Sequence, residues 1–302
     1  MIMTKSLKLT CAGIAAASAL ALPATLLAGT DTAGKSVIEE TKKSCITGDL
    51  GVNFVSKYYS RGALQEDQGA IGQPYADLYF SLYEGAGFID KVTLNLGIWG
   101  SIHSHHPGNV STTSGWYEFD YTPGVSVTFA KNFTLTASYT EFDSPNDSFV
   151  TSRNLNFNLA FNDADYLGAF ALHPHVAYLH EMSGKAANGP LGTRGNYYEA
   201  GIAPALPTFG PLSVTFPVTA GFGSHSFYAS NDSFGYASAG ANASVALTFV
   251  PACYGAWALN AGATYYYLHG SLADTNAGSG FVPGDSGRHN DFVFSGGIGA
   301  TF

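Results

Sequence analysis

Large apolar side chains alternate with small or polar ones along most of the chain from residue 48 onwards. In the run Asn154-Leu155-Asn156-Phe157-Asn158-Leu159, an apolar residue follows every amide. A period of two predicts a β-strand that separates two different environments. Amides on one face and large apolar groups on the other are typical of a barrel wall with water inside and lipid outside.

Twelve such strands can be laid out, at residues 48–60, 75–84, 91–102, 115–129, 132–143, 152–162, 168–180, 196–206, 212–223, 236–250, 255–269 and 290–302. The connections between them alternate in length, and short turns opposite long loops are the rule in membrane barrels. An even number of strands returns the C-terminus to the side of the N-terminus. We therefore expect an all-β fold, a transmembrane antiparallel up-and-down β-barrel of about 12 strands, with a narrow pore.

The last predicted strand stops at an aromatic C-terminus. It resembles the final strand of bacterial outer-membrane barrels, and the spacing of Gly297, Ala300 and Phe302 looks like the signal that the barrel-assembly machinery reads. The resemblance implies an outer-membrane location, with the lipid bilayer, lipopolysaccharide and the assembly machinery as partners.

The N-terminal residues agree with export. Residues 1–28 have a basic start and an apolar Ala- and Leu-rich run, which predicts a signal peptide, with cleavage after Ala21 or after Ala28. Residues 29–47 are expected to form a short periplasmic lead segment before the barrel at 48–302. Charged residues make up 12% of the chain, well below the ~25% of soluble proteins, and this favours a membrane barrel. The net charge of −9 argues against nucleic acid as a partner.

Three motifs in the first part of the chain resemble the TorF-like family of outer-membrane porins. The run Tyr58-Tyr59-Ser60-Arg61-Gly62-Ala63-Leu64-Gln65 is similar to its Tyr-x-x-Arg-Gly-x-x-Gln motif. Gly97-Ile98-Trp99-Gly100-Ser101 and Glu118-Phe119-Asp120-Tyr121 follow in the family's order. The resemblance covers residues 48–129 and implies a fold and a location more directly than an activity.

Ionisable and large polar side chains are expected on the inner faces of the strands, because charge facing lipid is costly. The predicted pore-lining residues are Lys57, Arg61, Asp77, Tyr79, Trp99, Glu118, Asp120, Arg153 and Glu199. Two roles stay open for them. They form a constriction that selects solutes by charge and size, or they neutralise one another, Arg61 with Glu118 or Asp120, in a plugged barrel.

Two cysteines of the expected mature chain, Cys45 and Cys253, fall at the same predicted membrane face. A disulfide between them and a pair of free thiols are both open from the sequence. The histidines at 103, 105 and 106 lack the partners of a metal site, and we expect no metal and no cofactor. Ser101 and His103 share a strand face, but no nucleophile motif marks them, so we expect no enzyme.

The expected function is passive diffusion of small hydrophilic solutes or ions through a porin-like channel. The alternative is a non-conducting structural or adhesive surface barrel, followed by a lipid-modifying enzyme of the outer membrane. The sequence does not indicate the solute or the oligomeric state.

Overall fold

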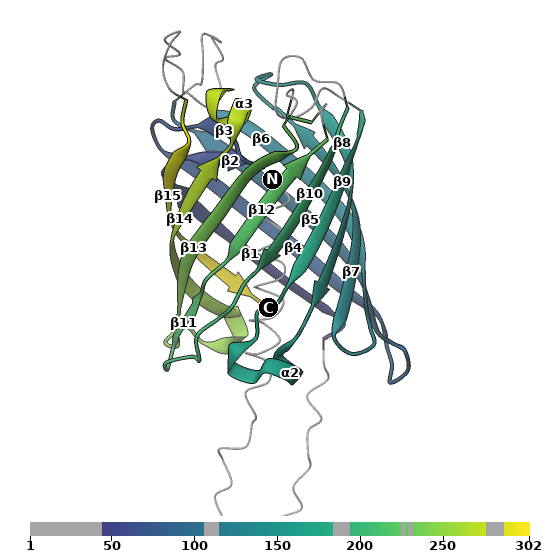
Figure 1. Ribbon diagram of the computed structural model, residues 1–302. Helices are drawn as coiled ribbons and strands as arrows, with labels where there is room; N and C mark the ends of the chain where they lie inside the picture. The colour runs from purple at the N-terminus through teal and green to yellow at the C-terminus, as the bar shows by residue number, and fades with distance from the viewer. Residues whose placement is uncertain (1–43, 106–114, 184–193, 225–226, 229–231, 276–286) are drawn as a thin grey trace, which may run out of the picture.

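The wall of the protein is a closed antiparallel β-barrel of twelve strands (Figure 1). The computed structural model describes residues 44–105, 115–183, 194–224, 227–228, 232–275 and 287–302. The wall consists of β1 (Ile46–Val55), β4 (Ile71–Glu84), β5 (Ile89–His103), β6 (Trp116–Phe129), β7 (Phe133–Asp143), β8 (Ser152–Phe161), β9 (His175–Ser183), β10 (Asn196–Ile202), β11 (Leu212–Thr215), β12 (Val218–Gly223), β13 (Phe234–Ala246), β14 (Ala256–Leu268) and β15 (Asn290–Thr301).

Segments β11 and β12 together make one wall strand, because both pair with β13. Pro217 lies between them and has no amide hydrogen to donate to the sheet, which accounts for the interruption. The Pro217 carbonyl still accepts a hydrogen bond from the backbone of Gly240. In the described part of the chain, no helix is both long and apolar enough to cross a membrane.

The first and last strands close the barrel. β1 pairs with β4 on one side and with β15 on the other, with Asn53 opposite Gly297. Beyond the strand end, the backbone amides of Gly48 and Phe302 each donate to the carbonyl of the other at 2.9 Å. The C-terminal residue is therefore part of the seam, at the end of the barrel where the short turns lie (Figure 1).

The predicted alternation of faces is confirmed. Leu135, Phe157 and Ile98 are exposed on the outer surface, where lipid would cover them. On β8, Asn154 and Asn156 are buried in the interior. On β8, amide side chains therefore face the lumen and apolar ones face outward, as in a membrane barrel.

Two predicted strand boundaries differ most from the structure. The first strand ends at Val55 rather than residue 60, and the chain then turns into the barrel. The strand predicted at 168–180 begins only at His175. The residues before it form two short helical turns, α2 (Ala164–Leu167) and η1 (Gly168–Phe170), in a segment that has no apolar–polar alternation.

The predicted inward position of Arg153 is also wrong. Arg153 alternates with the buried Ser152 and Asn154, so it lies on the outer face. There its guanidinium pairs with Glu141 at 2.7 Å, half exposed. Because side-chain direction reverses with every residue of a strand, an assignment shifted by one position moves a residue to the opposite face.

The two cysteines of the described chain are free and exposed. Cys45 precedes β1, and Cys253 lies in η2 (Ala252–Tyr254), the short turn before β14. The disulfide that was left open from the sequence is therefore not formed in this structure.

The turn between β8 and β9 depends on one carboxylate. Asp163 accepts hydrogen bonds from the backbone amides of Leu172 at 3.0 Å and His173 at 2.9 Å. Burial acts to raise the pKa of Asp163, but these backbone donors outweigh it and hold the pKa below its ordinary value.

Replacing this carboxylate should weaken the barrel in a pH-dependent way. Asp163→Asn is expected to lower the free energy of unfolding by roughly 1–3 kcal/mol at neutral pH. Since the folded-state pKa is lowered, the stabilisation is complete above the unfolded-state pKa, about 3.9, and is lost as the pH falls through the folded-state value. Urea unfolding of both proteins in detergent at pH 7 and at strongly acidic pH checks this. A difference that persists undiminished in acid contradicts it.

Candidate functional site: the barrel lumen

A hairpin from the connection between β1 and β4 occupies the interior of the barrel. It consists of β2 (Tyr58–Ser60) and β3 (Ala63–Glu66), which pair only with each other. Arg61 and Gly62 form its turn with φ angles of 50° and 85°, values that glycine adopts readily and other residues seldom do. All residues from 58 to 63 are buried. Because the hairpin is surrounded by wall strands, it fills part of the lumen rather than forming an external loop.

One side of the hairpin packs on β5 and β6. The ring of Tyr58 lies 5.6 Å from that of Trp99, and its hydroxyl donates to Glu118 at 2.8 Å. Tyr117 contributes a perpendicular ring contact at 6.4 Å. The three aromatic residues belong to one buried cluster with Ile71 and Phe142.

The opposite side of the hairpin packs on β14 and β15. Tyr59 stacks on Tyr266 with ring centres 4.9 Å apart and donates its hydroxyl to Asp291 at 2.6 Å. Lys57, just before the hairpin, forms an ion pair with the same carboxylate, and Arg288 pairs with it at 3.3 Å. Asp291 thus fixes the base of the hairpin to the last strand through two side chains, Lys57 and Tyr59.

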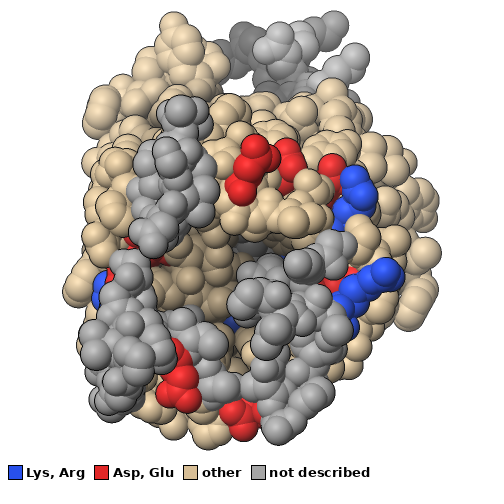
Figure 2. All heavy atoms as spheres, turned by 90° about the horizontal axis from the view of Figure 1, so that it is seen from above, with Lys and Arg blue, Asp and Glu red and all other residues tan. Residues whose placement is uncertain are grey.

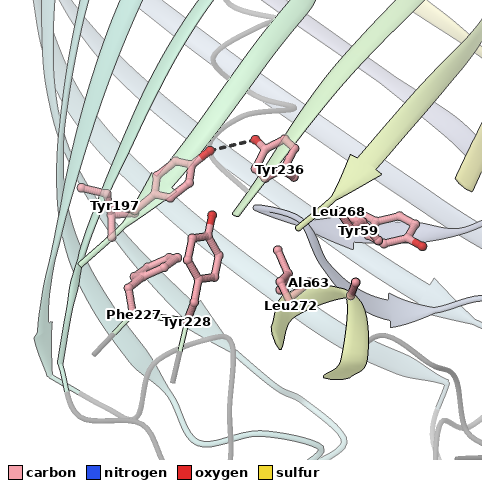
Figure 3. Packing of buried hydrophobic residues seen from close by; sticks show 10 residues of the cluster. Tyr59, Ala63, Tyr197, Phe227, Tyr228, Tyr236, Leu268 and Leu272 are labelled. Atoms are coloured by element: carbon pink, nitrogen blue, oxygen red, sulfur yellow. Dashed lines mark hydrogen bonds between the residues drawn. The ribbon is translucent and has the colours of Figure 1, made fainter. Parts of the chain in front are cut away.

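The tip of the hairpin reaches a second buried cluster (Figure 3). In it, the hydroxyls of Tyr197 and Tyr236 share a hydrogen bond of 2.8 Å, and Tyr228 donates to the backbone carbonyl of Arg61 at 3.2 Å. A side chain at Gly62 would meet the ring of Tyr236 at 2.6 Å. Only glycine therefore allows the turn to approach this wall so closely.

Arg61 lies across the lumen, between the walls. Its guanidinium carbon is 5.0 Å from the centre of the Phe142 ring and 5.8 Å from that of Tyr197. It is 1% exposed, and none of its side-chain nitrogens has a hydrogen-bond partner among the described atoms. The direct hydrogen-bonded pairing of Arg61 with Glu118 or Asp120 that the sequence left open is not formed, and cation–π contacts take its place.

The end of the hairpin is held by Glu66. One carboxylate oxygen lies 3.3 Å from Nδ1 of His105 and 3.8 Å from Nδ1 of His103. The other accepts hydrogen bonds from the backbone amides of Asp67 and Gln68, both at 2.9 Å. The Glu66 carboxylate therefore connects the end of the hairpin to the histidines at the end of β5. It also binds the backbone that follows the hairpin.

Ser101 and His103 do lie together, with 2.8 Å between Oγ and Nε2. Both are buried beneath the hairpin, at 0% and 3% exposure, which leaves no access for a substrate. Their geometry suits a structural contact at the base of the hairpin. His106 lies outside the described residues, within which no group of three His, Cys, Asp or Glu side chains could hold a metal ion.

Below the hairpin, towards the short turns, the inner faces become partly exposed. On β7 the inward residues change from the buried Phe142 and Thr140 to the partly exposed Ser138, Thr136 and Thr134. The inner faces of β6 and β13 show the same trend. Between the hairpin and the short turns, the lumen is therefore lined by small polar groups that keep accessible surface, whereas at the hairpin the inward side chains are buried.

The predicted pore-lining residues fall at two levels. Trp99, Glu118 and Asp120 are buried at the hairpin, with Arg61 at its tip and Lys57 at its base. Glu199 is buried beside the tip and accepts hydrogen bonds from Tyr197 at 2.8 Å and His175 at 3.2 Å. Asp77 and Tyr79 line the wider part below, where Tyr79 donates to Asp49 at 2.8 Å.

The aromatic residues against which the hairpin packs, chiefly Phe142, Tyr197 and Tyr236, were not predicted from the sequence. A signal for the inserted hairpin was present at its start. Two adjacent tyrosines, Tyr58 and Tyr59, break the apolar–polar alternation, and a Gly follows three residues later.

Seen from the loop end, carboxylates and a smaller group of cations surround a central hollow (Figure 2). The hairpin, β2 and β3, lies inside the barrel at this end (Figure 1). The loop end is thus the narrow part of the lumen and the turn end the wide part.

Solved structures of outer-membrane proteins have the same kind of barrel. An outer-membrane channel from Pseudomonas putida F1 superposes with a TM-score of 0.50 at 10% identity, over 90% of this chain and 100% of that one. The NanC porin gives 0.43 at 10% identity, over 84% and 98% of the two chains. Outer-membrane phospholipase A from Escherichia coli gives 0.43 at 12% identity, over 84% and 92%. At such low identity these likenesses concern the fold alone.

No model of a protein family and no curated protein matches the chain. The resemblance to the TorF-like porins therefore stays a prediction.

Proposed function

We propose that the protein is a narrow outer-membrane channel for passive diffusion of small hydrophilic solutes or ions. The observation that carries this proposal is the lining of the lumen. Small polar side chains face inward from the turn end up to the hairpin, and they are partly exposed there. Apolar side chains face outward over the same strands. A polar lumen in an apolar wall is the arrangement that lets water and solutes cross a bilayer.

The hairpin gives the channel its selectivity by size. It touches β5 and β6 on one side, β14 and β15 on the other, and β7 and β10 at its tip. A solute has to pass between these contacts, so only small molecules are expected to cross. Nothing in this scheme consumes energy, and net transport follows the concentration gradient.

The proposed outer-membrane location rests on the N-terminal segment and on the closing strand. Residues 1–28 would direct export, and Gly297, Ala300 and Phe302 on the closing strand would be read by the assembly machinery. The turn end, which holds both ends of the barrel chain, would then face the periplasm and the loop end the exterior.

Planar-bilayer recording tests the function. The chain from residue 29 is refolded, its β-structure is confirmed by circular dichroism, and current is recorded in potassium chloride. We expect discrete unit steps, and liposomes containing the protein should release a small sugar while retaining a large dextran.

A barrel that folds and inserts but passes neither ions nor sugar would overturn the proposal. The many contacts of the hairpin would then favour the second candidate, a non-conducting structural or adhesive barrel. Loop replacement that abolishes adhesion to a surface would support that alternative.

A further inference from the structure

The connection between β8 and β9 exposes large apolar side chains beyond the end of the wall. In its two helical turns, α2 and η1, Tyr166 is 72% exposed and Phe170 is 84% exposed. Leu167 and Leu172 are exposed beside them, and no charged or amide side chain occurs from 166 to 172. Apolar surface gathered in this way marks a contact with a membrane or with another protein.

This connection has a well-defined backbone. The amides of Tyr166 and Leu167 donate to the carbonyl of Asp163 at 3.0 and 2.9 Å, and the amide of Ala171 donates to that of Gly168 at 3.2 Å. The Asp163 carboxylate is itself bonded to backbone amides at the far end of the connection. Helical turns pair backbone polar groups within the segment, which an apolar environment requires.

Ring contacts join this connection to the outer surface of the wall. The ring of Tyr166 lies 5.8 Å from that of Phe161, which stacks on Phe133 at 4.7 Å. Phe133 stacks on Phe129 at 5.6 Å, and Phe129 contacts Phe88 at the same distance. Residues 129, 133 and 161 lie opposite one another in register, on the outward side of their strands. The apolar surface of the connection therefore continues the surface that faces lipid.

The charged side of the connection faces the rim of the barrel. Asp165 accepts a hydrogen bond from the side chain of Asn132 at 3.1 Å. Asn132 follows the turn between β6 and β7, where Lys131 is exposed and its backbone amide donates to Asp90. Acidic side chains thus point towards the neighbouring turns, and the apolar side chains are left at the outer surface.

From this continuity we infer that residues 164–172 form an apolar foot that inserts into the bilayer leaflet at the turn end, where α2 lies (Figure 1). The inference rests on the proposed membrane location. Tyrosine and phenylalanine are favoured at the boundary between headgroups and acyl chains. Aromatic residues at strand ends are general in membrane barrels. Here the connection itself, beyond the last strand residue, is the part that enters the lipid.

Spin labelling in vesicles tests the foot. The chain from residue 29, with Cys45 and Cys253 replaced by serine, is labelled with a nitroxide at Phe170→Cys and reconstituted into phosphatidylcholine vesicles. Collision rates are measured with oxygen, which concentrates in lipid, and with a nickel chelate, which stays in water. Leu135→Cys on the outer wall is the lipid reference, and Lys131→Cys is the water reference in a neighbouring turn.

We expect the oxygen-to-nickel ratio at 170 to exceed that at 131 severalfold and to approach that at 135. Tyr166→Cys should give the same result, and it carries the test if the variant at 170 does not fold. Circular dichroism and the heat-dependent shift in gel mobility establish that each labelled barrel is folded.

The possible failures are distinguishable. Labels at 166 and 170 that behave like the label at 131, while the label at 135 stays in lipid, overturn the foot and leave the membrane location standing. Labels at 166 and 170 shielded from both reagents also overturn it, because protein rather than lipid would then cover the segment. A folded barrel whose label at 135 is in water overturns the membrane location itself.

Discussion

Removing the hairpin should increase the unit conductance severalfold. Replacing residues 58–66 with a short Gly-Ser linker takes away Tyr58, Tyr59 and Arg61, which bridge the lumen between opposite walls. The remaining interior is lined by small polar residues, and twelve strands enclose more space than the roughly eight whose interior side chains fill. Single-channel recording of the two proteins in the same salt measures the effect.

The substitution is designed to leave the wall intact. Val55, the last residue of β1, pairs with Ile71, the first of β4, so the chain leaves and re-enters the wall at adjacent points. A short linker can therefore join these strands without changing their register. Circular dichroism and the heat-dependent shift in gel mobility should match the wild type. Equal conductance in two well-folded barrels would show that the hairpin does not obstruct the pore.

Gly62→Val should drive the hairpin tip away from its wall. Gly62 has a φ angle of 85°, where a non-glycine residue costs roughly 1–3 kcal/mol. The added Cβ would also meet Tyr236 at 2.6 Å and Leu272 at 2.8 Å. Because Tyr236 on β13 and Leu272 in the short helix α3 (Gly270–Thr275) are fully or almost fully buried, there is little room for them to yield.

Trypsin can report this displacement. It cleaves after arginine, and Arg61 is buried within the barrel in the wild-type protein. We expect the folded wild type to resist cleavage at Arg61 and Gly62→Val to be cut there at least tenfold faster, since about 1.4 kcal/mol corresponds to a factor of ten in the exposed population. Gly87→Val is the matched control, because a side chain at Gly87 meets no atom within 4 Å. Equal cleavage of all three proteins would contradict the buried position of the tip.

The wall of the barrel could be predicted from the sequence because its strands separate lipid from water. Every second residue must then be apolar, as in the alternation of Leu155 and Phe157 with Asn154 and Asn156. This requirement acts on each strand separately. The number of wall strands and their antiparallel order could therefore be predicted from the alternation. It failed at 164–170, where backbone hydrogen bonds to Asp163 replace strand pairing.

The hairpin could not be predicted in the same way. Its two faces both meet protein, so Tyr58 and Tyr59 are buried against opposite walls although they are neighbours in the chain. No period of two marks such a segment, and its partners Phe142 and Tyr197 are distant in sequence. The sequence therefore identified Arg61 and Glu118 as inward residues but not the contacts that Arg61 makes.

A cross-link between the hairpin and an inward residue of β14 can show whether the hairpin lies inside the barrel. Tyr59→Cys is combined with Tyr266→Cys in the chain from residue 29, with Cys45 and Cys253 replaced by serine, and a short bismaleimide is added to the folded protein. Tyr59 stacks on Tyr266 in the lumen, whereas Tyr267 points outward on the same strand. The structure predicts rapid cross-linking of 59 to 266 and little of 59 to Tyr267→Cys, detected as linked peptides by mass spectrometry. Equal cross-linking of the two pairs, or none of 59 to 266, would contradict a hairpin inside the barrel.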